Sequence, residues 1–297
     1  MKTLLTGATG AAGSFIANEF VRDRQAVRML VRDRSKATAL AKVPTVEVVE
    51  GDMSRRESLG SVLDGVERVL MISASRLDMV ETQCTFIDAC KTAGARHVIK
   101  LSGLDARRET TFPFGLMHKA VEDHLERSGL AWTHLRPSGF MQEYLREAPS
   151  VIHESALYFP LGDVALNPVD LVDVGKVGFA LLRDGGHEGR TLPMTGPEAL
   201  TMTEIADRIS RVVGSVVRYV PVSRADRRQS LVAHGIPPEF ADALDRQVHE
   251  RLLGGLESRV DVSTQQLFQV RPTTFLEFAK RHAEAFGGGA VAVRGPE

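Results

Sequence analysis

The sequence predicts an α/β protein built on a doubly wound parallel sheet, and three observations support this fold class. Short apolar runs alternate with longer amphipathic stretches along the first half of the chain. The runs are apolar on both faces, as in parallel strands that helices cover on both sides. A glycine-rich turn directly follows the first run. Right-handed crossovers between such strands place a ligand crevice at their carboxyl ends.

The expected elements of this N-terminal part follow from the two hydrophobic periods. The expected strands are 2–6, 26–31, 46–49, 68–74, 97–102 and 131–136. The expected helices between them are 13–23, 35–41, 54–63, 79–93 and 117–128. We therefore assign residues 1–150 to a Rossmann-type nucleotide-binding domain, completed by about 163–184.

The alternation weakens after about residue 150, where we expect a smaller α/β substrate-binding region at 151–286. Thr201 and Glu204 have the spacing of a capping box and predict the start of a helix. The other expected elements are a strand, turn and helix at 163–183, a helix within 195–214, a strand at 216–223, and helices over 224–256 broken by the turn 235–238. The tail, 287–297, has no pattern and is expected to be disordered.

The composition argues against several functional classes. The net charge is −1, so no overall field favours nucleic acid or an anionic membrane. No apolar run approaches the roughly 18 residues of a membrane span, and the first run meets the glycine turn too early for a signal peptide. Cys84 and Cys90 fit reduced core thiols of a cytoplasmic protein. The nine histidines form neither an HExxH motif nor a Cys/His cluster, so no metal is expected.

The segment TGATGAAG places Gly7, Gly10 and Gly13 between a strand and a helix. In a dinucleotide-binding turn the first glycine allows the tight turn, the second lets the backbone approach a pyrophosphate, and the third lets the helix pack close to the sheet. The helix N-terminus then offers free N–H groups and a partial positive charge to the phosphates. Further phosphate contacts are expected from Thr9 and from the N–H groups of Ala11 and Ala12. This context predicts dinucleotide binding rather than a glycine turn without a ligand.

The residues after the second strand favour NADP(H), with NAD(H) possible. A site selective for NAD(H) usually places an acidic residue there, to accept from the ribose 2′-hydroxyl. Here Arg32 comes first and Lys36 lies close behind it. A guanidinium can bind a 2′-phosphate in bidentate fashion, although Asp33 could still serve a ribose. After the third strand, Asp52 and Met53 are expected against the adenine, with Asp52 also able to cap a helix.

A set of segments resembles the NmrA-like group of atypical short-chain dehydrogenases. The segments are TGATGAAG, VRDRSKA, EGDM, SGL, HKAVEDHLERSGLAWTHLRP, NPVDLVDVG and TGPEALTMTEIADRISRVVG. The group includes NADPH quinone reductases, azoreductases, triphenylmethane reductases and isoflavone-type reductases. The resemblance extends over about residues 1–285, and it is specific as a set although each segment alone is common. It implies that Ser73, Ala74 and Ser75 pass along the cofactor, and that Pro137 to Phe140 follow the carboxamide side of the nicotinamide.

The resemblance also implies two candidate catalytic residues. Ser102 would lie beside the nicotinamide ribose, and Lys119 would reach the ribose hydroxyls. Taken alone, Lys119 could equally be a solvated helix lysine paired with Glu122 or Asp123. His118 could line the pocket, but we interpret it as a partly buried helix residue rather than a base.

The usual proton donor of short-chain dehydrogenases is missing. Those enzymes carry a Tyr four residues before the Lys, and here that position is Gly115. None of Tyr144, Tyr158 and Tyr219 has the required spacing. Reduction of a carbonyl leaves an alkoxide that needs an acid, whereas a quinone, azo or cationic dye leaves a delocalised product that solvent can protonate. The sequence therefore favours a conjugated acceptor, or an enzyme in which Lys119 is itself the acid.

The expected substrate contacts follow the sixth strand. They are Phe140, Met141, Glu143 and Tyr144, with core packing of a loop as the alternative for all except Glu143. Relatives often have an Asn at the position of Glu143, which leaves that contact open. Together these features predict an NADPH-dependent reductase of a small conjugated molecule. The alternative is an NmrA-type redox sensor that binds the cofactor and catalyses little. The oligomeric state is left open.

Overall fold

The computed structural model describes residues 2–254 and 258–288. A seven-stranded sheet lies at its centre, in the order β3-β2-β1-β4-β5-β6-β8, with every neighbouring pair parallel. The direction of winding reverses between β1 and β4, which is the point where doubly wound sheets bind ligands. The strands are β1 (Lys2–Thr6), β2 (Val27–Val31), β3 (Val46–Glu50), β4 (Val66–Met71), β5 (His97–Leu101), β6 (Ala131–Pro137) and β8 (Arg190–Met194).

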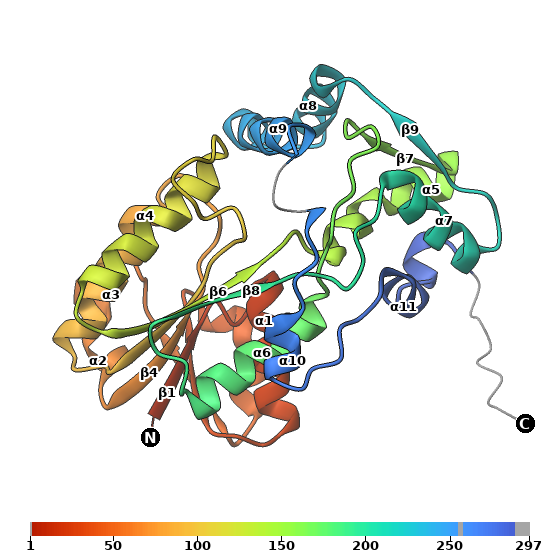
Figure 1. The fold of residues 1–297 in the computed structure, drawn as a ribbon. Helices are drawn as coiled ribbons and strands as arrows, with labels where there is room; N and C mark the ends of the chain where they lie inside the picture. Colours follow the sequence, from red (N-terminus) through yellow and green to blue (C-terminus); the bar gives the residue numbers. More distant parts are fainter. Residues whose placement is uncertain (1, 255–257, 289–297) are drawn as a thin grey trace, which may run out of the picture.

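Helices cover both faces of the sheet, as Figure 1 shows. On one face α1 (Ala11–Arg22) and α6 (Leu171–Asp184) pack together, with the rings of Phe20 and Phe179 4.7 Å apart in an edge-on contact. On the other face lie α2 (Gly60–Leu63), α3 (Met79–Thr92) and α4 (Pro113–Arg127). The sheet is therefore covered on both sides, which explains why most positions of its strands are apolar.

The second region has its own apolar core. The two-stranded parallel sheet of β7 (Ala156–Phe159) and β9 (Arg218–Pro221) packs with α5 (Ala148–Glu154), α7 (Met202–Val213) and α11 (Phe275–Arg281). The remaining elements are α8 (Arg224–Ala233), α9 (Pro238–Leu252), α10 (Ser263–Leu267) and the 3₁₀ turns η1 (Arg34–Ala37), η2 (Leu40–Lys42), η3 (Arg56–Ser58), η4 (Met141–Glu147) and η6 (Glu284–Phe286). In Figure 1, α8 and α9 lie at the top, between α4 and the β7–β9 sheet. Phe240 on α9 packs against Phe114 on α4, with 5.1 Å between the rings.

Most expected elements are confirmed. Each of the six expected strands of the N-terminal part forms, and the capping box of Thr201 and Glu204 starts α7. The turn at 235–238 separates α8 from α9. Asp170 caps α6 by accepting from the Val172 N–H at 3.0 Å. Cys84 and Cys90 are free thiols.

Several expectations about local structure are wrong. The expected helix at 35–41 is the pair of turns η1 and η2, and the one at 54–63 is broken into η3 and α2. Residues 163–169 form only isolated bridges, Leu166 with Leu200 and Val169 with Phe140, instead of a strand. We did not expect β7 or β8. β8 is short and contains Pro193, which is tolerated because β8 is the edge strand beside β6. The disordered tail we expected lies almost wholly outside the described residues.

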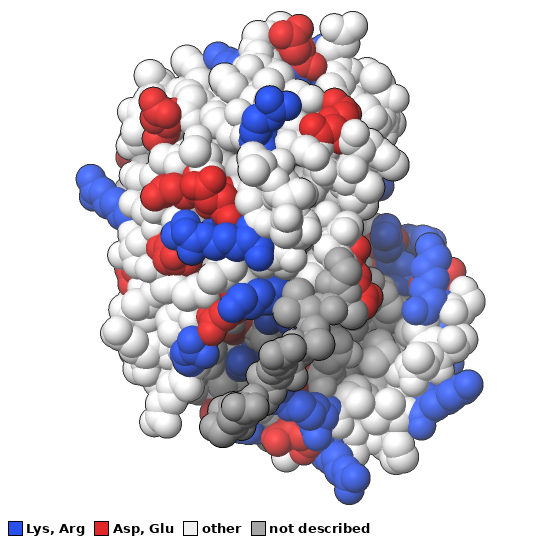
Figure 2. Space-filling view, turned by 90° about the vertical axis from the view of Figure 1, so that its right-hand side faces the viewer, with Lys and Arg blue, Asp and Glu red and all other residues white. Residues whose placement is uncertain are grey.

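The surface charge is mixed. On the face in Figure 2, basic and acidic side chains are interspersed rather than gathered into patches of one sign. Within the described ranges, no helix combines the length and apolar character that crossing a bilayer requires.

Candidate active site

A cleft of about 1680 Å³ lies at the carboxyl ends of β1 to β6, and residues of α8 and α9 also line it. Of the residues predicted to bind cofactor or substrate, most line it: Gly7, Thr9, Gly10, Ala11, Ala12, Arg32, Lys36, Asp52, Met53, Ser73, Ala74, Ser75, Ser102, Phe140, Glu143 and Tyr144. Gly13, Lys119, Pro137 and Met141 do not line it. The structure therefore brings together residues that follow six strands, β1 to β6, and lie far apart in the chain.

The glycine turn forms a cradle at one end of this cleft. Gly7 has φ +65°, a conformation that favours glycine, and its carbonyl accepts from the Gly10 N–H at 2.9 Å. A side chain on Gly13 would collide with the Gly7 backbone, so this glycine serves packing rather than contact. Helix α1 starts without a side-chain cap. The first-turn N–H groups at Ala11 and Ala12 are therefore left for a ligand, which fits a pyrophosphate.

The basic residues after β2 differ in whether they line the cleft. Arg32 is exposed and lines the cleft together with Lys36. Arg34 instead donates to the Val48 carbonyl at 2.6 Å. Asp33 caps η1, with its Oδ1 accepting from the Ser35 N–H and hydroxyl, and these hydrogen bonds lower the pKa of its carboxyl. Two cations thus face the cleft here while the nearby carboxylate is engaged elsewhere.

Asp52 and Met53 line the same part of the cleft. Asp52 Oδ1 accepts from the Ser54 N–H at 2.9 Å and from its hydroxyl at 2.7 Å. These bonds lower the pKa of Asp52 and keep it ionised. The carboxylate therefore holds the local turn while remaining at the cleft, and it caps no helix, because η3 begins only after Arg55.

Two serines border the middle of the cleft. The Ser73 hydroxyl accepts from the Gln83 amide at 2.8 Å. Ser102 is 6% exposed, and its Oγ has no hydrogen-bond partner of good geometry among the described residues, although it lies close enough to help lower the pKa of Glu122. A buried hydroxyl with unused capacity at a cleft is suited to a ligand hydroxyl.

The segment after β6 divides between cleft and core. Phe140, Glu143 and Tyr144 line the cleft. The Tyr144 ring also packs edge-on against Phe275 at 5.1 Å, so it belongs to both. Met141 is 2% exposed in the core of the second region and does not reach the cleft. Pro137 ends β6 in register with Met194 and is likewise outside it.

Lys119 on α4 is paired with carboxylates of its own helix. Its Nζ lies 2.5 Å from Asp123 Oδ1 and about 4 Å from carboxylate oxygens of Glu122 and Glu126. Lys119 thus forms the pairing of the alternative interpretation, and it is not among the residues that line the cleft. The neighbouring residue on α4, His118, lines the cleft instead. Successive side chains on a helix point about 100° apart, so His118 lines the cleft while its neighbour Lys119 does not.

The absence of a Tyr at position 115 has a steric reason. A Cβ on Gly115 would stand 2.6 Å from the carbonyl oxygen of Asp105 and 2.9 Å from Thr110 Cγ2. The loop before α4 therefore occupies the space that a side chain would need. The proton donor of ordinary short-chain dehydrogenases has no room in this chain.

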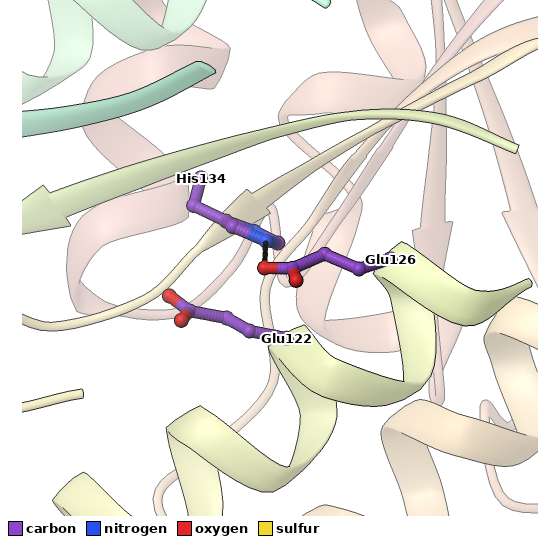
Figure 3. A group of neighbouring side chains, drawn as sticks. All are labelled: Glu122, Glu126 and His134. Carbon is purple, nitrogen blue, oxygen red and sulfur yellow. Dashed lines mark hydrogen bonds and ion pairs between the residues drawn. The ribbon is translucent and has the colours of Figure 1, made fainter. Parts of the chain in front are cut away.

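Figure 3 shows Glu122 and Glu126 on α4 pointing toward His134 on β6. Their ligand-type atoms lie within 4.8 Å of one another, close enough for a metal ion. Two cationic side chains already form ion pairs with these carboxylates. Arg136 forms a two-point ion pair with Glu122, and Lys119 lies 3.9 Å from Glu126. The cluster therefore has the charge balance of a structural ion-pair network, and we assign it no metal.

Helices α8 and α9 contribute side chains that sequence reasoning missed. The cleft residues from these helices include Arg224, Arg227, Leu231, Phe240, Leu244, Val248 and Arg251. Arg227 pairs with Glu147 at 2.6 Å and lies 4.7 Å over the Phe159 ring. The amphipathic pattern predicted both helices, but nothing local indicated that their apolar face would close the cleft.

Comparison with known proteins matches this architecture. The profile of the NmrA-like family matches residues 1–279, and the chain belongs to this family. The expected family and fold class are both confirmed.

Several relatives match over nearly their whole length. The chain is 32% identical to the NAD(P)H azoreductase of Xenophilus azovorans, covering 96% of this chain and 99% of that protein. It is 30% identical to quinone oxidoreductase 2 of Escherichia coli, covering 94% and 97%. The crystal structure of the Escherichia coli NADPH-dependent quinone oxidoreductase with NADPH superposes with a TM-score of 0.85 at 28% identity, covering 94% and 99%. The Citrobacter triphenylmethane reductase with NADP(H) gives 0.85 at 25%, covering 95% and 100%.

Proposed function

We propose that this protein is an NADPH-dependent reductase that transfers hydride to a small conjugated acceptor, such as a quinone or an azo compound. The observation that carries the proposal is one continuous cleft. It joins a phosphate-type glycine cradle and two cations at one end to an aromatic-lined space under α8 and α9 at the other.

The cofactor end fits NADP(H) better than NAD(H). The free N–H groups of α1 would hold the pyrophosphate, and Arg32 with Lys36 would bind the 2′-phosphate. The binding of NADPH and NADP(H) in the quinone and triphenylmethane reductase structures supports this choice. NAD(H) remains usable, because most of the cradle contacts do not involve the 2′-phosphate. The bound cofactor would supply the hydride.

The acceptor end fits a flat apolar molecule. Phe140, Tyr144, Phe159 and Phe240 line it, and such rings favour stacking with a conjugated system. With no Tyr acid and no room for one at Gly115, a quinone suits the site, because its reduced anion is less basic than an alkoxide. Ser102, with its unused hydroxyl, is placed to position the ribose or the acceptor. The azoreductase and quinone oxidoreductase among the relatives act on acceptors of this kind by name.

The test is a screen of NADPH oxidation with quinones, azo dyes, enones and imines as acceptors. We expect turnover with quinones or azo dyes and little with simple ketones. Tight NADPH binding without turnover on any acceptor would contradict the proposal and favour a redox sensor. We place the protein in the cytoplasm, where its two free thiols would stay reduced.

A further inference from the structure

Lys100 is a buried cation that the proposed function does not use. It lies near the end of β5 with its side chain entirely buried. Its Nζ is 2.8 Å from Nδ1 of His118 and 3.3 Å from the Leu101 carbonyl. A buried lysine is costly, so its partners hold it in one place. The lysine therefore fixes the orientation of the His118 ring.

His118 connects this buried lysine to the cleft. It belongs to α4, lines the cleft and is only partly buried. Its Cδ2 would be 3.5 Å from a Cβ on Gly103, an ordinary contact distance, so the ring lies beside the residue that follows Ser102. Because Nδ1 faces Lys100, Nε2 is the nitrogen left for a ligand. That atom has no hydrogen-bond partner within residues 2–254 and 258–288.

The charges around the pair favour a neutral imidazole beside an ammonium that can lose its proton. Burial lowers the pKa of Lys100 to about 7, and the charge of Arg136 on β6 lowers it further. Glu122 on α4 and Cys84 on α3 act in the opposite direction. Burial also lowers the pKa of His118 well below its usual value, helped by the charges of Lys100 and Arg136. The Lys100 ammonium then donates to Nδ1, and the imidazole proton sits on Nε2.

We propose that His118 and Lys100 form a proton relay that supplies the proton of the reduction, with His118 as the acid that contacts the acceptor. The relay rests on the proposed function. Hydride brings two electrons to the acceptor and leaves an anion on its oxygen or nitrogen. The Nε2–H bond of His118 breaks as its proton moves to this oxygen or nitrogen of the acceptor. At the same time Nδ1 of His118 takes a proton from Lys100. A solvent proton entering at Nε2 restores both groups after the product leaves.

The relay predicts different losses for two acceptors. A hydrazo nitrogen anion is far more basic than a hydroquinone anion, so methyl red needs the acid more than 1,4-naphthoquinone does. In single-turnover measurements with saturating NADPH, His118→Gln should slow methyl red reduction about 10²-fold or more, within the range of acid–base catalysis. The same variant should slow naphthoquinone reduction less than tenfold. A merely structural role would slow both reactions equally, and equal losses would overturn the relay.

The Lys100→Met variant tests the buried partner. The wild-type rate with methyl red should fall as the pH rises through about 7, because the relay needs the protonated lysine. The variant should lose this step in the pH profile, and NADPH affinity should stay within about twofold. His124→Gln, on the same helix but paired with Asp88 at 2.8 Å on α3, is the matched control and should behave as wild type. A wild-type profile retained in Lys100→Met would overturn the relay.

Nitrogen NMR of the wild-type protein without cofactor gives a readout that needs neither turnover nor a folded variant. We expect His118 as the neutral Nε2–H tautomer at pH 7. A Nδ1–H tautomer or a charged ring would contradict the relay. If the wild type reduces neither methyl red nor naphthoquinone nor any acceptor of the screen, the proposed function fails as a whole. An active wild type with unaffected variants would remove the relay alone.

Discussion

A side chain on Gly13 would collide with Gly7, because its Cβ would stand 2.6 Å from the Gly7 carbonyl carbon. Gly10 differs, since its backbone is extended with φ −88° and its nearest neighbour to a Cβ is the Gly7 oxygen at 3.2 Å. Gly13 is thus required for the packing of the turn, whereas Gly10 is expected to matter for binding the cofactor.

Gly10→Val should therefore keep the fold and lose the cofactor, because the side chain would fill the space of the pyrophosphate. Gly13→Ala should instead destabilise the protein by at least about 1–3 kcal/mol, the usual cost of overpacking. Thermal unfolding and calorimetric titration with NADPH check both. Unchanged NADPH affinity in Gly10→Val would show that the loop does not hold the pyrophosphate.

Arg32→Ala should weaken NADPH binding by about 1.5–3 kcal/mol, the range for hydrogen bonds to charged groups, and leave NADH binding nearly unchanged. The control is Arg34→Ala, whose guanidinium bonds the Val48 carbonyl outside the cleft. That change should affect stability without changing cofactor preference. Equal losses of NADPH and NADH affinity in Arg32→Ala would remove its role at the 2′-phosphate.

Lys119→Met should leave the NADPH dissociation constant within about twofold of wild type. The lysine lies between three carboxylates of its own helix and outside the cleft, so its loss should cost up to about 1 kcal/mol of stability. Fluorescence titration with NADPH and urea unfolding measure the two effects. A tenfold loss of cofactor affinity would restore the ribose-binding role that the family resemblance implied.

His97 makes stability depend on pH. It is 4% exposed, and burial lowers its pKa to about 4 against the pull of Glu188. The unfolded chain binds the proton first, near pH 6.5, so stability is complete above that pH and is lost as the pH falls toward 4. The loss from this group should reach about 2 kcal/mol at pH 5. The difference between the urea midpoints at pH 7.5 and 5 should therefore be smaller in His97→Gln than in wild type, with the remainder due to His118 and His134, whose pKa values are also lowered. A difference as large as in wild type would rule His97 out.

The sequence was informative wherever the signal was local. The glycine turn, the strands beside it and the pair Arg32 and Lys36 follow from neighbouring residues, and the structure brings them to one cleft. Asp52 is a further example, because its carboxylate accepts from the N–H of Ser54, only two residues away in the chain.

Tertiary packing decided what the sequence could not. Whether His118 or Lys119 enters the cleft depends on how α4 is rotated against β5 and β6. Lys100 stands inside an apolar run, where a lysine carries no periodic signal until its partner His118 is placed beside it. The strands β7 and β8 are short, and β8 contains Pro193, so neither shows the alternation that predicts a strand.

The central claim is hydride transfer from NADPH to a conjugated acceptor in the cleft. The most direct measurement follows NADPH consumption and 1,4-naphthoquinone reduction together under anaerobic conditions, in the wild type and in Gly10→Val. We predict that one NADPH is oxidised for each quinone reduced by the wild type, and that Gly10→Val shows only the protein-free rate. Wild-type NADPH consumption no faster than without protein, despite tight NADPH binding, would contradict the account.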